Sequence, residues 1–139
     1  MEENAVFFKW NDNMSVRSEE IDNQHKKLVG LLNEMYTAFM NKQHNERVGP
    51  IIDQMASYAL YHFETEEKYF AAFHYERSAE HILEHLEFRQ KVQEFVEKFK
   101  QNNSALTYNV MNFLRNWLNN HILDTDRKYI DCFTKNGVK

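Results

Sequence analysis

The sequence predicts an all-α protein, an up-down-up-down antiparallel four-helix bundle with an N-terminal arm. Three observations predict this fold. The 139 residues include only 3 Gly and 1 Pro, which leaves little material for the many turns of a strand-rich protein. Four long stretches carry apolar residues at spacings of three and four, the period of a helix. The segments between these stretches are short, and short connections favour antiparallel neighbours in a bundle.

A single domain is expected for residues 1–139, because a chain of this length can bury a core without disulfides. The only cysteine, Cys132, excludes a disulfide framework and a thiolate-rich metal site. The formal net charge of −4, with acids and bases interspersed, offers no basic patch for nucleic acid. No apolar run is long enough for a transmembrane helix, and the acidic start is unlike a signal peptide. The expected location is therefore the cytoplasm.

The arm takes in residues 1–17, and its apolar residues are expected to pack on the bundle: Val6, Phe7, Phe8 and Trp10. The first helix is expected over about residues 18–40. Ser18 is a suitable N-cap, and Glu19 and Glu20 suit the first turn. One face of this helix is apolar except for a histidine within it, near the start of the helix: Ile21, His25, Leu28, Leu32, Met35 and Phe39.

The second helix is expected over about residues 45–72. Gly49 and Pro50 mean that it either begins there, with Pro in its first turn, or is kinked there. Two polar residues, His62 and Glu66, interrupt its apolar face one helical turn apart.

The third helix is expected over about residues 78–101, with Ser78 as its candidate cap. His81 and His85 replace core residues near its start, and apolar residues continue the same face beyond them.

The fourth helix is expected over about residues 105–132, with Ser104 as its candidate cap. Its apolar face leads to His121, but continuing in phase beyond that point would give a poor core. A shift of one residue brings Asp126, and then Phe133, onto the inner face. A one-residue insertion in a helix forms a π-turn, and such turns gather at functional sites. We therefore predict a π-turn between His121 and Asp126.

The polar interruptions of the four apolar faces form a set of five histidines and two carboxylates: His25, His62, Glu66, His81, His85, His121 and Asp126. Because helix direction alternates in the predicted bundle, all seven fall at the same end. A lone histidine on an apolar face usually belongs to the core. Two buried carboxylates among five imidazoles instead need a common positive partner, since a buried unpaired charge is costly. Metal ions supply that charge.

The ligand types suit iron, manganese or zinc, because imidazole and carboxylate are present without thiolate. Seven ligands exceed the needs of one ion, so the sequence predicts two. A carboxylate can bridge two ions through its two oxygens, whereas a histidine cannot. Glu66 and Asp126 are therefore the expected bridges.

Four motifs carry a resemblance to a known family and extend over nearly the whole chain. They are Ile-Asp-Asn-Gln-His at 21–25, His-Phe-Glu-Thr-Glu at 62–66, His-Ile-Leu-Glu-His at 81–85 and Trp-Leu-Asn-Asn-His-Ile-Leu-Asp-Thr-Asp at 117–126. Each motif is weak alone, but their combined spacing resembles the hemerythrin family, in particular its bacterial single-domain members. No metal position departs from the family pattern.

The resemblance implies a non-haem di-iron site with an oxo or hydroxo bridge. One iron would be bound by three histidines, His81, His85 and His121, and the other by two, His25 and His62. Glu66 and Asp126 would bridge the two irons. The iron with fewer histidines would keep a position open for dioxygen. Five residues match pocket positions of the family, although core packing explains each equally well: Leu28, Phe63, Trp117, Leu118 and Ile122.

The expected function is reversible dioxygen binding, for transport, storage or delivery, and not enzymatic catalysis. A sensor or reductase of dioxygen or nitric oxide on the same fold is the alternative. Dioxygen and an oxygen-consuming acceptor protein are the expected partners, with no nucleic acid or membrane, and a monomer is favoured. A ferritin-like site is disfavoured because the chain has no Glu-x-x-His pair. An inverted zinc-protease motif at 81–85 would leave five of the seven side chains without a role.

Overall fold

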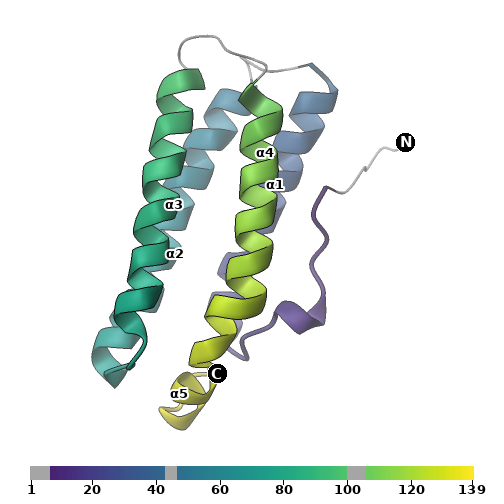
Figure 1. Cartoon of the computed structure of the whole chain (residues 1–139). Helices are drawn as coiled ribbons and strands as arrows, with labels where there is room; N and C mark the ends of the chain where they lie inside the picture. Colours follow the sequence, from purple (N-terminus) through teal and green to yellow (C-terminus); the bar gives the residue numbers. More distant parts are fainter. Residues whose placement is uncertain (1–6, 43–46, 100–105) are drawn as a thin grey trace.

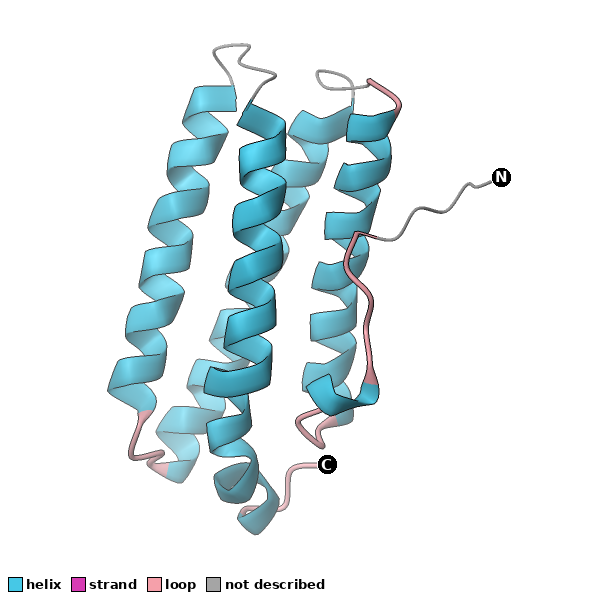
Figure 2. Cartoon of the chain, turned by 45° about the vertical axis from the view of Figure 1, so that its right-hand side comes forward, coloured by secondary structure: helices cyan, strands magenta, loops and turns pink. Residues whose placement is uncertain are grey.

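The computed structural model describes residues 7–42, 47–99 and 106–139. Within these ranges the chain is helical and contains no strand (Figure 2). Four long helices make up the bundle: α1 (Glu19–Met40), α2 (Gly49–Phe73), α3 (Ser78–Phe99) and α4 (Leu106–Asn120). Consecutive helices run in opposite directions (Figure 1). The predicted all-α four-helix bundle is confirmed.

Local sequence explains where the helices begin. The Ser18 hydroxyl accepts a hydrogen bond from the backbone N–H three residues later, as predicted for an N-cap of α1. Helix α2 begins at Gly49 with Pro50 in its first turn, the first of the two alternatives considered. Ser78 was predicted to be the cap, the residue just before α3. In the structure it is the first residue of the helix, so the predicted start differs by one residue. Ser104 lies outside the described residues.

The N-terminal arm is fixed to α1 through the side chain of Asn33. The amide oxygen of Asn33 accepts hydrogen bonds from the backbone N–H groups of Phe7 and Phe8, at 3.0 and 2.9 Å. Its amide nitrogen donates to the Phe8 carbonyl at 2.8 Å. The expected packing of the arm on the bundle is confirmed for Phe7, Phe8 and Trp10, and Val6 lies outside the described residues.

The arm contains one 3-10 turn, η1 (Asp12–Met14). The residues in and after this turn are bound by α1 on one side and by the C-terminal part of the chain on the other. Asp22 of α1 accepts hydrogen bonds from the Ser15 hydroxyl at 2.6 Å and from the Val16 backbone N–H at 2.8 Å. Arg127, near the other end of the chain, donates to the carbonyls of Asn13 and Ser15 at 2.7 and 3.2 Å. The arm therefore joins the first helix to the last turns of the protein.

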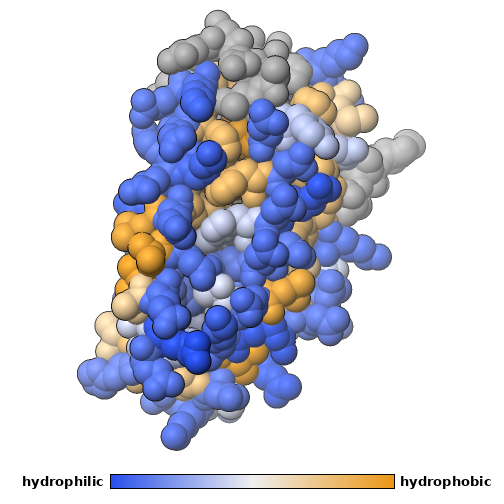
Figure 3. All heavy atoms as spheres, in the orientation of Figure 1, coloured by the Kyte–Doolittle hydropathy of each residue, from blue (hydrophilic) through white to orange (hydrophobic). Residues whose placement is uncertain are grey.

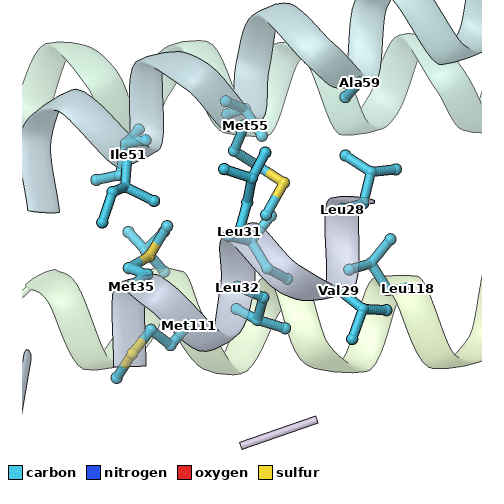
Figure 4. Packing of buried hydrophobic residues seen from close by; sticks show 14 of the residues in the cluster. Leu28, Val29, Leu31, Leu32, Met35, Ile51, Met55, Ala59, Met111 and Leu118 are labelled. Carbon is cyan, nitrogen blue, oxygen red and sulfur yellow. The ribbon is translucent and has the colours of Figure 1, made fainter. Parts of the chain in front are cut away.

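Among the described residues, two hydrophobic clusters form the core. In the larger one, apolar side chains of α1 face Ile51, Met55 and Ala59 of α2 on one side and Met111 and Leu118 of α4 on the other (Figure 4). The smaller cluster gathers buried residues from the arm, α1, α2, the loop after α2 and the end of the chain: Val16, Ile21, Phe70, Tyr75, Tyr129 and Phe133. Burial of these side chains supplies the main driving force for folding.

The surface is largely hydrophilic. Figure 3 shows polar and charged side chains over much of one face of the molecule, with apolar side chains in smaller areas. Among the described helices, none combines the length and the apolar character that crossing a membrane requires.

Candidate metal centre

The structure brings all seven predicted polar side chains together in the interior. Each is at most 2% exposed. Helix α1 supplies one histidine, α2 a histidine and a glutamate, α3 two histidines, and the segment after α4 a histidine and an aspartate: His25, His62, Glu66, His81, His85, His121 and Asp126.

The segment after α4 departs from α-helical geometry between its two polar residues. It forms a π-turn, η3 (His121–Thr125), followed by a 3-10 turn, η4 (Asp126–Tyr129), and a last short helix, α5 (Ile130–Lys135). The Asp126 N–H donates to the carbonyl of His121, five residues earlier, which is the π pattern. The predicted π-turn is confirmed, and it places both side chains on the inner face.

Glu66 lies between two groups of histidines. Its Oε1 is 3.0 Å from Nε2 of His85 and 3.4 Å from Nε2 of His81. Its Oε2 is 3.5 Å from Nε2 of His62 and 4.0 Å from Nε2 of His25. Each oxygen of this carboxylate therefore faces a different set of imidazoles.

Asp126 has the same arrangement from the opposite side. Its Oδ1 is 2.8 Å from Nε2 of His81 and 2.9 Å from Nε2 of His121, and its Oδ2 is 2.9 Å from Nε2 of His25. The imidazoles thus divide into a three-histidine group (His81, His85 and His121) and a two-histidine group (His25 and His62). Both carboxylates present one oxygen to each group.

The converging atoms are suited to metal ions because they do not satisfy one another. Eight of them form no hydrogen bond among the described residues: Nε2 of His25, His62, His81, His85 and His121, Oε1 of Glu66, and both oxygens of Asp126. Buried polar atoms are nearly always hydrogen-bonded, so a cluster of eight such atoms requires an explanation. Ligand atoms of four residues lie within 4.8 Å of one another in each of two sets. The donor set fits two cations side by side.

Hydrogen bonds on the outer ring nitrogens fix the orientation of three imidazoles. Nδ1 of His85 donates to Glu67 at 2.8 Å, and Nδ1 of His121 donates to Glu84 at 2.8 Å, because a carboxylate can only accept. Nδ1 of His62 lies 2.6 Å from the amide oxygen of Gln24. With the proton on Nδ1, the inner Nε2 carries the lone pair that a metal needs.

Tyr129 adds a further hydrogen bond to the site. Its hydroxyl donates to Oε2 of Glu66 at 2.6 Å, and its side chain is fully buried. Burial, followed by the charge of Glu66, raises the pKa of Tyr129 well above its ordinary value, so the hydroxyl remains a donor.

Burial and charge oppose each other in setting the pKa values of the cluster. Burial lowers the pKa of His62 to about 3, against the opposing charge of Glu66. Burial also disfavours the charged form of His121, but the charge and contact of Asp126 outweigh it and raise the pKa to about 10. Burial would raise the pKa of Asp126, yet His121 and its neighbours hold it well below the ordinary value. Burial would also raise the pKa of Glu66, but nearby histidines outweigh it and lower that pKa, so both carboxylates are anionic. A bound metal ion would displace a proton from His121, whereas His62 is already neutral.

The five residues predicted to line a pocket all lie in or against the larger hydrophobic cluster. Four are buried, Leu28, Phe63, Leu118 and Ile122, and Trp117 is partly buried. Two of the five stack on imidazoles. The Phe63 ring lies 3.9 Å from the ring of His85 at 11°, and the Trp117 ring lies 4.2 Å from that of His121 at 13°.

Sequence reasoning missed the outer partners Gln24, Glu67, Glu84 and Tyr129. Gln24 and Glu84 stand within the quoted motifs, and Glu67 directly follows Glu66, but no periodic signal separates them from surface residues. Tyr129 could be predicted only to face inward.

Comparisons with known proteins identify the family. The family model described as Hemerythrin HHE cation binding domain matches residues 16–133. A bacteriohemerythrin of Clostridium acetobutylicum is 32% identical over 128 residues, covering 89% of this chain and 99% of that one. A bacteriohemerythrin of Pseudomonas aeruginosa is 31% identical over 123 residues, covering 88% and 79%.

Solved structures show the same fold. The crystal structure of a wild-type hemerythrin superposes with a TM-score of 0.85 at 24% sequence identity, covering 92% of this chain and 98% of that one. The structure of a hemerythrin mutant gives a TM-score of 0.87 at 23% identity. With the family model matching most of its length, this chain belongs to the hemerythrin family.

Proposed function

We propose that this protein binds dioxygen reversibly at a non-haem di-iron centre. In this proposal the three-histidine group would hold one iron, the two-histidine group would hold the other, and Glu66 and Asp126 would each offer one oxygen to both. The observation that carries the proposal is the placement of one oxygen of each carboxylate toward each histidine group. The names of the relatives, hemerythrin and bacteriohemerythrin, support iron and dioxygen.

The unequal division of histidines gives the two positions different roles. An iron held by His25 and His62 would have one fewer protein ligand than an iron held by His81, His85 and His121, so it is the position that would accept a small molecule. A ferrous pair supplies the electrons that reversible dioxygen binding requires. The protein supplies the surroundings, since four of the five pocket residues are buried and apolar. Such surroundings exclude water and proton donors from the open position.

The first test is the metal content and visible spectrum of the purified protein. We expect about two irons per chain, and an absorption change that appears with dioxygen and disappears when dioxygen is removed. One metal per chain, or zinc in a fully occupied native sample, would contradict the di-iron assignment. Steady turnover of dioxygen or nitric oxide with a reductant would favour a reductase over a carrier.

The pocket is tested by Leu118→Tyr, which brings a hydroxyl into the apolar surroundings three residues before His121. We expect the reduced iron protein to be oxidised in air about tenfold faster, which corresponds to ~1.4 kcal/mol of barrier. Leu114→Tyr is the matched control, because Leu114 is equally buried one turn further from His121. Both variants overpack the core and should lose similar stability. Equal oxidation rates in the two variants would leave Leu118 with a packing role only.

A carrier of this kind needs a protein that consumes the dioxygen it releases. We propose such an acceptor as its partner in the cytoplasm, with this chain acting as a monomer. The interspersed acids and bases of the sequence, with no basic patch, favour neither nucleic acid nor an anionic membrane as a partner.

A further inference from the structure

Hydrogen bonds to the outer nitrogens of the imidazoles differ between the two histidine groups. We infer that Glu67 and Glu84 are positioning residues that make the three-histidine position the tighter-binding and more readily oxidised of the two. This inference rests on the proposed ligand assignment and goes beyond it, because neither glutamate is a ligand.

Both glutamates act on the three-histidine group. Oε2 of Glu67 is 2.8 Å from Nδ1 of His85, and Oε1 of Glu84 is 2.8 Å from Nδ1 of His121. Two of the three imidazoles in this group therefore donate to an anion. A carboxylate that accepts from the outer N–H draws that proton toward itself, which increases the electron density and the basicity of the inner nitrogen.

The two-histidine group has no such anion. Nδ1 of His62 contacts the neutral amide oxygen of Gln24, and the amide nitrogen of Gln24 donates to the Thr65 hydroxyl at 3.2 Å. Nδ1 of His25 has no hydrogen-bond partner among the described residues. These two imidazoles are therefore weaker donors to a cation than those of His85 and His121.

Glu84 is held in place by the π-turn itself. The Thr125 hydroxyl lies 2.9 Å from Oε1 and 3.0 Å from Oε2 of Glu84. Thr125 is the last residue of η3, so the turn that places His121 and Asp126 on the inner face also supplies the hydroxyl that orients Glu84. This shared geometry fixes the carboxylate against Nδ1 of His121.

The exposure of the two glutamates sets the expected size of the effect. Their side chains are 36% and 37% exposed, so water screens part of each charge. Loss of such partners typically weakens metal binding by about 10-fold to 100-fold. Because of the screening, we expect the lower end of this range, about tenfold for each glutamate.

The experiment is a titration of the metal-free protein with Co²⁺, followed by its visible absorption, for the wild type and for Glu67→Gln and Glu84→Gln. Wild type should take up two ions in two steps of different affinity. Each substitution should weaken the tighter step about tenfold and leave the weaker step unchanged. Glu87→Gln is the matched control. It removes the same charge from an exposed position one turn along α3, and both steps should stay as in wild type.

The reciprocal variant Gln24→Glu places a carboxylate beside His62 and should strengthen the weaker step. Thr125→Val keeps Glu84 but removes the hydroxyl that orients it, so it should give a smaller loss in the tighter step than Glu84→Gln. In the iron protein, either glutamate substitution should weaken the binding of ferric iron relative to ferrous iron. A tenfold loss of that preference raises the one-electron reduction potential of the site by about 59 mV. A merely structural role for the glutamates would not move this potential.

The outcomes separate this inference from the proposed function. A wild type that takes up fewer than two Co²⁺ ions would overturn the ligand assignment itself. A wild type that takes up two ions, with Glu67→Gln and Glu84→Gln indistinguishable from Glu87→Gln, would overturn only the inference about the glutamates. If the substitutions weakened only the weaker binding step, the glutamates would act on the other position, and the inference would again be overturned.

Discussion

Replacing Glu66 with alanine is expected to abolish binding of the metal pair. The carboxylate presents Oε1 to the three-histidine group and Oε2 to the two-histidine group, so its removal takes one ligand from each ion at once. It also leaves the buried Tyr129 hydroxyl without its acceptor. We expect the iron content to fall from about two per chain to one or fewer, measured by elemental analysis of protein reconstituted without oxygen.

Glu64→Ala is the control for this substitution. Glu64 lies two residues earlier on the same helix, is exposed, and belongs to neither group of potential ligands. It should keep the full metal content and the spectrum of the wild type. Two tightly bound irons in Glu66→Ala would show that the bridge has been assigned to the wrong carboxylate.

Removal of the metals is expected to lower the melting temperature by about 10–15 °C. A ligand present at about 1,000 times its Kd adds ~4.1 kcal/mol to the stability of the folded state. For a domain of this size, each kcal/mol shifts the melting temperature by roughly 2–4 °C. Much of that stabilisation would arise because bound metals would engage eight buried atoms that form no hydrogen bond among the described residues.

The metal-free protein should nevertheless unfold cooperatively, because neither hydrophobic cluster includes any of the seven candidate ligands. The measurement is circular dichroism during heating, with and without ferrous iron under anaerobic conditions. Addition of iron to Glu66→Ala should raise the melting temperature far less than in wild type. An unchanged melting temperature in wild type would mean that folding and metal binding are not coupled.

The parts of the structure that sequence reasoning predicted are those that repeat along a helix. Apolar periodicity predicted the four helices, and departures from it identified the five histidines and two carboxylates that converge in the interior. The one-residue shift between His121 and Asp126 even predicted the π-turn. These features could be predicted because a side chain on the inner face of a bundle must be either apolar or provided with a partner.

The outer partners of the site could not be predicted in the same way. Gln24, Glu67 and Glu84 meet their histidines across helix boundaries, at sequence separations of 38, 18 and 37 residues. Polar residues at the margin of a helix face look the same in sequence whether they meet water or a neighbouring imidazole. The role of Asn33 in holding the arm could not be predicted for the same reason, since its partners lie 25 and 26 residues away in the sequence.

The contact between the arm and the end of the chain has a consequence for the order of folding. Arg127 reaches carbonyls of residues 114 and 112 positions earlier, so the whole bundle lies within the loop that this contact closes. Closing so long a loop costs more entropy than local pairing does, and such contacts form once neighbouring elements are already in place. The helices can therefore assemble first, with the arm joining them afterwards. Because this contact is exposed and spans almost the full chain, we expect it to open before the buried contacts between the helices do.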